Sequence, residues 1–306
     1  MFDREVIYKR MRRYRMKGRL ELYAPLSLET SFQIGGPADI LFVPDNIAEA
    51  VQVVKLCHRD KIPLTVLGNG TNVLVRDGGV RGIVMKLEGL CELRRERSHI
   101  FAGAGAPLAA ICAFARDEGL SGLEFAGGIP GTAGGAVYMN AGAYGGEMKD
   151  VVYRTVTLDP EGSVGLIGST GHNFSYRYSV FQENNFIILE TEFVLAPFAK
   201  SEISARMDDY NARRESGQPM NRPSAGSVFR RPDKEGYYVG PMIEECGLKG
   251  FKIGGAQVSE KHAGFIINSG GASAADVLDL IGLIKMKVKK RFSVSLATEI
   301  RIIGED

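Results

Sequence analysis

A run of 20 residues from Gly127 to Gly146, GGIPGTAGGAVYMNAGAYGG, contains eight of the 38 glycines in this chain of 306 residues. Glycine brings no side chain to a core and loses more backbone freedom on folding than other residues. Such a density suits a backbone that approaches another group closely, turns with positive φ or presents N–H groups to an anion. The run therefore predicts either a cradle for a phosphate-bearing cofactor or a tightly packed region of turns and strands without a ligand.

The composition is that of an ordinary globular protein. Hydrophobic residues make up 44% and charged residues 24% of the chain, and its length predicts two or three domains. A net charge of +2 provides no general attraction for nucleic acid or an anionic membrane. No apolar run approaches a membrane span, and the N-terminus lacks the apolar core of a secretory signal, so we expect a cytoplasmic protein.

The cysteines and histidines show neither a disulfide framework nor a metal site. Cys57, Cys91, Cys112 and Cys246 lie far apart without a CxxC motif, which is typical of buried thiols in a reducing compartment. The four histidines have no metal-binding spacing such as HExxH. We therefore expect no metal.

The first 200 residues alternate between strands and helices, which indicates α/β units. A strand ends at Pro44, and Asn46 and Glu49 form the pattern of a capping box at the start of the next helix. A second helix is expected between Pro107 and Gly119. The other expected strands cover residues 62–67, 82–87, 100–104, 151–158 and 186–195.

A third unit begins near Lys200. Ser273 and Asp276 predict the start of a helix with one apolar stripe, formed by Val277, Leu280, Ile281, Ile284 and Val288. The other expected elements are helices at 201–215 and 239–246 and strands at 224–229, 263–267 and 294–303. In the last strand, alternation predicts Val294, Leu296, Ile300 and Ile302 on one face and Glu299 and Arg301 on the other.

Residues 9–19 carry seven basic residues, with Tyr8 and Tyr14 close by. One interpretation is an arm that binds RNA or lipid. The other, which we favour, is a solvated helix packed by Val6, Met11 and Leu20, because the rest of the chain has no basic surplus.

Two common nucleotide-binding motifs are missing. No GxGxxG follows a strand, because Gly103-Ala104-Gly105 lacks the third glycine, and no GxxxxGK[ST] is present. Two glycine-rich loops remain, Gly68–Asn72 and Gly127–Gly135. Their N–H groups could bind a diphosphate without a lysine, assisted by the side chains of Asn69, Thr71, Asn72 and Thr132. The alternative is two independent tight turns.

Three further residues stand out, although each also has an ordinary explanation. Arg177 lies between Tyr176 and Tyr178 and could simply stack on tyrosine at the surface. Ser227 follows Ala225-Gly226 and could be a turn serine. Glu299 could form an exposed ion pair of little energetic weight.

Taken in order along the chain, these positions belong to a set of ordered motifs, and the resemblance that they carry extends over nearly the whole chain from about residue 28 onward. The chain thereby closely resembles the UDP-N-acetylenolpyruvoylglucosamine reductase family, FAD-dependent enzymes of peptidoglycan-precursor synthesis. The motifs are TSFQIGGPADI (30–40), GNGTNVLVRDGG (68–79), GIPGTAGGAVYMNAGAYGGE (128–147), SYR (175–177), PSAGSVF (223–229), EECGLKGFKIGGAQVSEKHAGFIIN (244–268) and ATEIRIIG (297–304).

The resemblance implies an α+β fold with a vanillyl-alcohol-oxidase-type (PCMH-type) FAD-binding region of two α/β subdomains and a third, substrate-binding α/β domain. The expected limits are 1–27 for a basic N-terminal segment, 28–89 and 90–199 for the two FAD subdomains, and 200–306 for the substrate domain. We expect a monomer. No histidine or cysteine lies in the two glycine loops, so the FAD is expected to be non-covalent.

The resemblance also implies the chemistry: NADPH reduces FAD, and the reduced flavin then transfers a hydride to UDP-N-acetylglucosamine enolpyruvate. Arg177 matches the family arginine that polarises the substrate carboxylate, and Glu299 the glutamate that supports the same intermediate. Ser227 matches the serine that protonates the α-carbon. The expected cofactor-binding residues are Gly68, Asn69, Gly70, Thr71, Asn72, Gly127, Gly128, Ile129, Pro130, Gly131, Thr132, Gly135 and Asn140.

Only Tyr178–Asn185 separates Arg177 from the strand expected at 186–195. This is too short for the tyrosine-bearing loop that covers the substrate in one family subtype, so the chain resembles the second, shorter subtype. Tyr237 or Tyr238 could cover the substrate instead.

Two other functions are compatible with parts of the chain. One is an FAD oxidase that uses oxygen, against which the set of Arg177, Ser227 and Glu299 argues. The other is a non-catalytic nucleotide-sugar or RNA-binding module that uses the basic N-terminus.

Overall fold

The computed structural model describes residues 3–234 and 236–306, whereas Met1, Phe2 and Glu235 lie outside the described residues. The chain divides into two compact units, each assembled from segments that are distant in the sequence. Unit 1 contains the described residues up to 22 together with 40–69 and 82–214, and unit 2 contains 23–39, 70–81 and 215–306. The domain limits at residues 28, 90 and 200 stay predictions.

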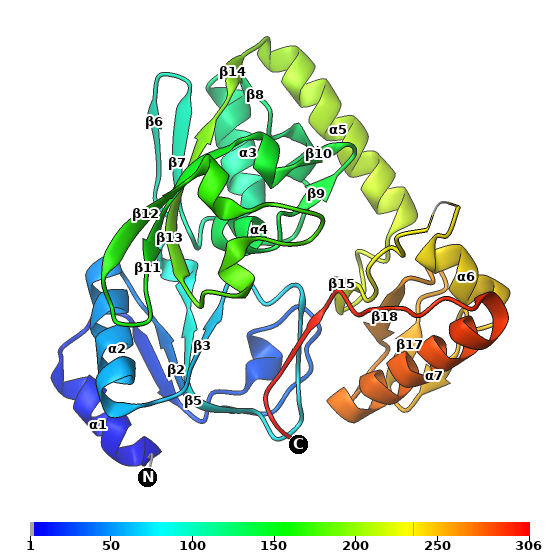
Figure 1. Cartoon of the computed structure of the whole chain (residues 1–306), viewed down its shortest axis with the longest axis horizontal. Helices are drawn as coiled ribbons and strands as arrows, with labels where there is room; N and C mark the ends of the chain where they lie inside the picture. The colour runs from blue at the N-terminus through cyan, green and yellow to red at the C-terminus, as the bar shows by residue number, and fades with distance from the viewer. Residues whose placement is uncertain (1–2, 235) are drawn as a thin grey trace. The chain divides into compact units, whose positions relative to one another are not determined.

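Unit 1 contains a four-stranded sheet in the order β1-β2-β5-β3. Strand β1 pairs antiparallel with β2, and β3 pairs parallel with β5. Two helices, α1 and α2, belong to this part of unit 1, at the N-terminal, blue end of the colour bar (Figure 1). The bounds are α1 Arg4–Arg13, β1 Arg19–Leu22, β2 Ala38–Val43, α2 Ile47–Asp60, β3 Leu64–Leu67 and β5 Val80–Lys86.

The capping pattern before α2 forms only in part. Asn46 Oδ1 accepts from Glu49 N at 3.0 Å, as a helix cap should. The Glu49 carboxylate, however, accepts from the backbone N–H groups of Lys17, Gly18 and Asp45 at 2.7, 3.1 and 2.9 Å. Glu49 therefore ties α2 to the chain that enters β1, a long-range role that the local pattern does not contain.

The basic N-terminal segment forms helix α1, as the favoured interpretation requires. Ile7 and Met11 are buried in the core of unit 1, whereas Val6 is 51% exposed. The prediction that Val6 packs the helix is wrong, because the face of α1 that contacts the rest of unit 1 carries Ile7 instead of Val6. None of the helices formed by the described residues combines the length and apolarity needed to cross a membrane.

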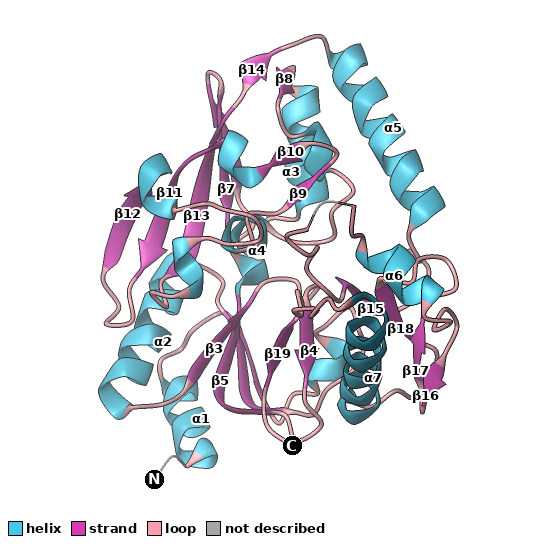
Figure 2. Cartoon of the chain, turned by 45° about the vertical axis from the view of Figure 1, so that its right-hand side comes forward, coloured by secondary structure: helices cyan, strands magenta, loops and turns pink. Residues whose placement is uncertain are grey.

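The second sheet of unit 1 has five antiparallel strands in the order β12-β11-β13-β7-β6. Helix α4 packs on β13 and β7, and one continuous hydrophobic core includes residues of both sheets, such as Met85, Ile100 and Phe193. The bounds are β6 Leu93–Glu96, β7 His99–Gly103, α3 Leu108–Asp117, α4 Ala133–Tyr138, β11 Val152–Leu158, β12 Val164–Gly168, β13 Ile187–Val194 and α5 Lys200–Gly217. Figure 2 shows these strands in magenta.

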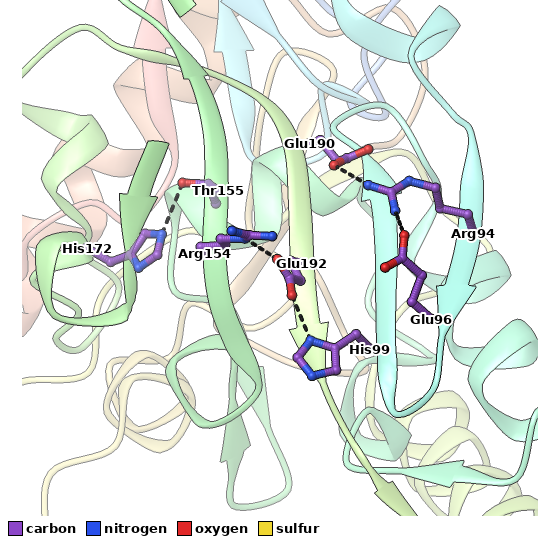
Figure 3. A network of polar contacts seen from close by, with 8 residues as sticks. All are labelled: Arg94, Glu96, His99, Arg154, Thr155, His172, Glu190 and Glu192. Carbon is purple, nitrogen blue, oxygen red and sulfur yellow. Dashed lines mark hydrogen bonds and ion pairs between the residues drawn. The ribbon is translucent and has the colours of Figure 1, made fainter. Parts of the chain in front are cut away.

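A polar network lies on this five-stranded sheet (Figure 3). The buried carboxylate of Glu192 contacts His99 Nδ1 at 2.7 Å and also forms an ion pair with Arg154. Arg94 donates to Glu96 and Glu190 at 2.6 and 3.1 Å. Glu192 pairs with groups of the two adjacent strands, Glu96 with Arg94 of its own strand, and Glu190 with Arg94 across β7. We therefore assign the network to the stability of the sheet.

Unit 2 has a four-stranded antiparallel sheet in the order β15-β18-β17-β16 and a parallel pair, β4 with β19. The predicted capping box of α7 is confirmed, because Ser273 and Asp276 cap each other's backbone. Its predicted apolar stripe is buried throughout. The bounds are β4 Val73–Val75, β15 Ser224–Ser227, α6 Val239–Glu245, β16 Lys252–Ile253, β17 Ala256–Val258, β18 Phe265–Asn268, α7 Ala274–Phe292 and β19 Arg301–Ile303.

The prediction of a long closing strand is wrong. Only Arg301–Ile303 forms a strand, opposite the equally short β4. Val294, Leu296 and Ile300 are buried as predicted, but Ile302 is 36% exposed, and Glu299 precedes the strand. The apolar alternation marks burial correctly at three of its four positions, yet a strand also needs a partner that runs beside it over its whole length.

Short elements complete the fold. They are the two-residue strands β8 Leu120–Ser121, β9 Gly142–Ala143, β10 Gly146–Glu147 and β14 Ala196–Pro197, and the 3-10 helices η1 Leu26–Leu28, η2 Leu87–Gly89, η3 Glu124–Ala126, η4 Met148–Asp150, η5 Ser169–His172 and η6 Val180–Gln182.

Candidate active site

The first residue of the Gly68–Asn72 loop meets the second glycine loop inside unit 1. Gly68 follows the carboxyl end of β3, and a Cβ atom placed on it would lie 2.7 Å from Thr132 Oγ1 and 3.9 Å from Gly135 Cα. Glycine at position 68 thus allows the backbone to approach the second loop closely. The sequence also allowed two independent tight turns, but in the structure Gly68 lies against the second loop.

Several N–H groups of the second loop are already used within the protein. Ala133 and Gly134 donate to the carbonyls of Ala106 and Ala104, both at 2.9 Å, and Gly135 donates to its cap residue Thr132 at 3.4 Å. A Cβ on Gly134 would lie 3.0 Å from Ala104 Cβ. Part of the glycine content therefore serves packing, as the ligand-free interpretation predicts.

Helix α5 packs against the start of the same loop. A Cβ on Gly128 would lie 2.6 Å from Asn211 Oδ1 and 3.1 Å from Arg214 Nε, and one on Gly127 would lie 3.2 Å from Met207 Cε. Burial lowers the pKa of Arg214. Sequence reasoning did not single out this face of α5, because the helix carries no motif and shows only a polar composition.

Gly135 differs from Gly134, although the two are neighbours in α4. Apart from Thr132 Oγ1 at 3.5 Å, a Cβ on Gly135 would meet no atom within 4 Å. The packing of the protein therefore does not require glycine at this position. Bare backbone beside open space, with Thr132 close by, is the kind of surface that a dinucleotide can approach closely.

Residues 70–72 of the first loop belong to unit 2. Gly70 has a φ of +63°, and a Cβ there would lie 2.7 Å from Glu29 O. Asn72 Nδ2 donates to Glu299 O at 3.3 Å, and Asn72 O accepts from Arg301 N at 2.9 Å. Asn72 therefore connects this loop to the segment that carries Glu299.

Asn140, another predicted cofactor residue, is fully buried in unit 1. Its amide nitrogen donates to Glu147 Oε2 at 2.7 Å and to Ser175 O at 2.9 Å, and its oxygen accepts from Lys149 N at 2.9 Å. These contacts are all within the protein, so the side chain organises the loops around it. A direct role toward the cofactor stays a prediction.

Arg177 occupies a tight turn of unit 1. Ser175 and Tyr178 exchange backbone hydrogen bonds of 3.2 and 3.1 Å across it, and Arg177 has a φ of +55°. Its Nη2 donates to Gly142 O at 3.2 Å, and its guanidinium carbon lies 5.1 Å from the centre of the Tyr176 ring. The predicted stacking on tyrosine is present, but a left-handed backbone is uncommon for arginine and clusters at functional sites.

Ser227 and Glu299 lie on neighbouring segments of unit 2. Glu299 N donates to Val228 O at 2.8 Å, and Phe229 forms an isolated bridge with Thr298. The register between β15 and β18 shifts between Ser224 and Ser227, where Gly226 has a φ of +77°. Such bulges often redirect side chains next to active sites. The hydrogen bond from Glu299 to Val228 places Glu299 beside the segment of Ser227, although the two residues are distant in the sequence.

The side chains of Ser227 and Glu299 are half-buried. Ser227 Oγ donates to Phe229 O at 3.3 Å, which is longer than a usual O–H···O hydrogen bond of about 2.5–3.0 Å. The hydroxyl proton is therefore weakly engaged with the protein and can turn toward another acceptor.

His262 borders the same region of unit 2, and sequence reasoning missed it. A Cβ on Gly264 would lie 2.9 Å from His262 Cε1 and 3.7 Å from Ser227 Oγ. Its Nδ1 accepts from Gly264 N at 3.0 Å. Burial lowers the pKa of His262, which favours the neutral ring. In the sequence, His262 is one of four histidines without metal-ligand spacing, and no motif marks it as a site residue. No cluster of potential metal ligands occurs among residues 3–234 and 236–306.

The two tyrosines suggested as a substrate cover have different surroundings in unit 2. Tyr237 is half-buried and meets Phe292 edge-on, with 6.5 Å between ring centres. Tyr238 is 52% exposed, and the Arg231 guanidinium lies 4.4 Å from its ring centre. Tyr238 is thus the more available of the two, and its role stays a prediction.

Two family models match the chain. The model described as "FAD binding domain" matches residues 38–168, and "UDP-N-acetylenolpyruvoylglucosamine reductase, C-terminal domain" matches residues 218–303. These ranges include the residues of both glycine loops and, in the second range, Ser227 and Glu299. They confirm the predicted α+β fold class with its FAD-binding region.

Related proteins match over nearly the whole chain. A UDP-N-acetylenolpyruvoylglucosamine reductase of Caldanaerobacter subterraneus subsp. tengcongensis is 47% identical, covering 98% of this chain and 99% of the relative. One from Listeria monocytogenes is 48% identical, covering 94% and 96%. The crystal structure of UDP-N-acetylenolpyruvylglucosamine reductase (MurB) from Thermus caldophilus matches with a TM-score of 0.80 and 34% identity, covering 94% of this chain and all of that one.

Proposed function

The chain belongs to the UDP-N-acetylenolpyruvoylglucosamine reductase family, and we propose that it reduces UDP-N-acetylglucosamine enolpyruvate to UDP-N-acetylmuramate with NADPH. It is an FAD-dependent oxidoreductase of peptidoglycan synthesis. The observation that carries the proposal is the adjacency of Ser227 and Glu299 in unit 2, which joins two residues required by one reaction.

The proposed FAD site uses the predicted residues of both glycine loops, with Gly68, Thr132 and Gly135 around the open space described above. When bound, FAD supplies the redox centre that accepts a hydride from NADPH and donates one to the enolpyruvyl group. The bare backbone at Gly68 and Gly135 would permit close approach of the diphosphate. The absence of cysteine and histidine from both loops supports non-covalent binding.

We assign the polarisation of the substrate carboxylate to Arg177. Its planar guanidinium can donate two parallel, charge-assisted hydrogen bonds to a carboxylate. Negative charge grows on this carboxylate when the β-carbon receives a hydride. A fixed positive group aimed at that charge stabilises the transition state more than the ground state.

We assign protonation of the α-carbon to Ser227 and support of the charged intermediate to Glu299. A serine hydroxyl is a weak acid, but its partner in this step is a strongly basic carbon. The weak hydrogen bond from Ser227 Oγ to Phe229 O supports a proton that can be released. The bond from Glu299 N to Val228 O fixes the backbone of Glu299 next to the strand that carries Ser227.

An anaerobic absorbance experiment tests this function. We expect NADPH to bleach the flavin spectrum of the purified protein, and UDP-N-acetylglucosamine enolpyruvate to restore it with formation of UDP-N-acetylmuramate. Failure of the enolpyruvyl substrate to reoxidise the flavin would refute the proposal. Consumption of oxygen with an alcohol, without any response to NADPH, would favour the oxidase alternative.

We propose the cytoplasm as the compartment and a monomer as the active form. The cysteines of the chain are all free, and burial raises the pKa of the Cys57 and Cys112 thiols to about 12. Such inert, unpaired thiols support a reducing compartment.

A further inference from the structure

We propose that Gln182 is a positioning residue for Arg177 and that its side-chain amide holds the arginine turn in the conformation the reaction needs. The inference rests on the proposed function, because it concerns the hydride transfer assigned to the Arg177 site. It begins from the Ser175–Tyr178 turn, in which Arg177 has a left-handed backbone. Residues other than glycine and asparagine adopt this conformation at a cost, so the surrounding contacts must maintain it.

Gln182 provides such a contact from η6. Its Nε2 donates to Arg177 O and to Tyr138 O, both at 3.0 Å. Both partners are carbonyl oxygens, which only accept, so the NH2 end of the amide must face them. One side chain thereby bridges the carbonyl of the left-handed arginine to the end of α4, the helix that contains Gly135.

Two other contacts define the rest of the turn. Buried Asn140 donates to Ser175 O at 2.9 Å, and Arg177 Nη2 donates to Gly142 O at 3.2 Å. The side chain of Gln182 reaches the carbonyl of Arg177 itself, so its amide acts on the residue with the unusual φ. We infer that it controls where the guanidinium points.

The chemistry of Gln182 permits a nearly isosteric test. Gln182→Glu keeps the shape but places a carboxylate against two carbonyl oxygens, which replaces two attractions with repulsion. A small displacement of a positioning group can slow the chemical step substantially. We expect reoxidation of the reduced flavin by UDP-N-acetylglucosamine enolpyruvate to slow roughly ten- to a hundredfold. Reduction by NADPH should stay near the wild-type rate.

A double-mutant cycle with Arg177→Ala separates positioning from a general structural effect. If Gln182 acts through Arg177, Gln182→Glu should slow reoxidation in the wild type but not further in the Arg177→Ala protein. Binding of UDP-N-acetylmuramate by calorimetry supplies a second readout and should show the same lack of additivity. Equal effects of Gln182→Glu in both backgrounds would overturn the inference, as would a wild-type reoxidation rate in the single variant.

Gln257 offers a matched control in unit 2. It is also half-buried, and its Nε2 donates to one carbonyl, Gly250 O, at 3.2 Å. Gln257→Glu creates a similar repulsion away from Arg177 and should leave both half-reactions unchanged. If Gln182→Glu fails to fold, Gln182→Met removes the donor without adding charge; unchanged reoxidation there would overturn the inference. A wild-type protein that reduces its flavin but ignores the enolpyruvyl substrate would instead refute the proposed function.

Discussion

Replacement of Gly135 by alanine should separate cofactor binding from folding. The new Cβ would meet only Thr132 Oγ1, at an ordinary contact distance of 3.5 Å. Alanine also favours a helix over glycine by about 0.5–1 kcal/mol, and Gly135 lies within α4. We therefore expect the flavin-free protein to be as stable as the wild type or slightly more stable.

The same methyl group would occupy the open space proposed for FAD. Overpacking of a well-fitted site typically costs about 1–3 kcal/mol, which corresponds to a roughly five- to 150-fold weaker affinity. Fluorescence quenching during titration of the flavin-free protein with FAD measures this change. Thermal unfolding of the same preparation measures stability.

Gly134→Ala is the matched comparison. There the Cβ would lie 3.0 Å from Ala104 Cβ and 3.2 Å from Ala104 O, so the fold rather than the cofactor would resist it. We expect Gly134→Ala to lower stability by about 1–3 kcal/mol. Gly282→Ala, in α7 with no atom within 4 Å of the new Cβ, should stabilise without affecting FAD. Unchanged FAD affinity of Gly135→Ala, or a loss of stability like that of Gly134→Ala, would refute the proposal that Gly135 borders the FAD site.

Three further predictions concern the proposed chemistry and the buried histidines. Ser227→Ala should leave flavin reduction by NADPH nearly intact and slow reoxidation by at least about tenfold; equal losses in both half-reactions would contradict the acid role. Glu299→Gln should impair mainly reoxidation, and unaffected turnover would remove it from the site. Burial lowers the pKa of His172, as it does for His262, so the unfolded chain binds protons first as the pH falls below about 6.5. The free energy of unfolding should therefore keep its full value above that pH and decrease below it. Denaturant titrations should show a smaller decrease for His172→Gln and an unchanged one for exposed His58→Gln; identical profiles for all three proteins would refute the assignment.

The contacts of His172 illustrate how far local sequence reasoning reached. In the sequence, residues 172–182 (HNFSYRYSVFQ) are dense in aromatic and polar groups, which by itself assigns no role to His172. In the structure, His172 is buried and stacks on Phe174 with 4.8 Å between ring centres. Its Nε2 contacts Thr155 Oγ1 at 3.1 Å (Figure 3). Phe174 is a local partner, but Thr155 lies 17 residues away in β11, so no local pattern could have identified that contact.

Elements with a strong local signal were predicted well. The capping residues and apolar stripe of α7 are as expected, and α2 begins where Asn46 predicted. Helices α3, α5 and α6 and strands β3, β7, β11 and β13 lie within about two residues of their predicted bounds. Helix α4 was missed, because glycine disfavours a helix and the cap at Thr132 gave too little indication. The short strands β4, β6 and β12 were missed as well.

The sequence by itself determined where backbone must be bare, where the long amphipathic helix begins and which motifs relate the chain to its family. These properties depend on residue types at fixed local spacing, so they can be read without coordinates. Only the tertiary structure decided which glycine has which role: Gly134 packs on Ala104, whereas Gly135 faces open space next to Gly68. It also joined Glu299 to the strand of Ser227 and gave Arg177 its left-handed turn. The physical reason is that each of these outcomes depends on a hydrogen bond or contact with a distant segment, and the partner is selected only when the chain closes around its core.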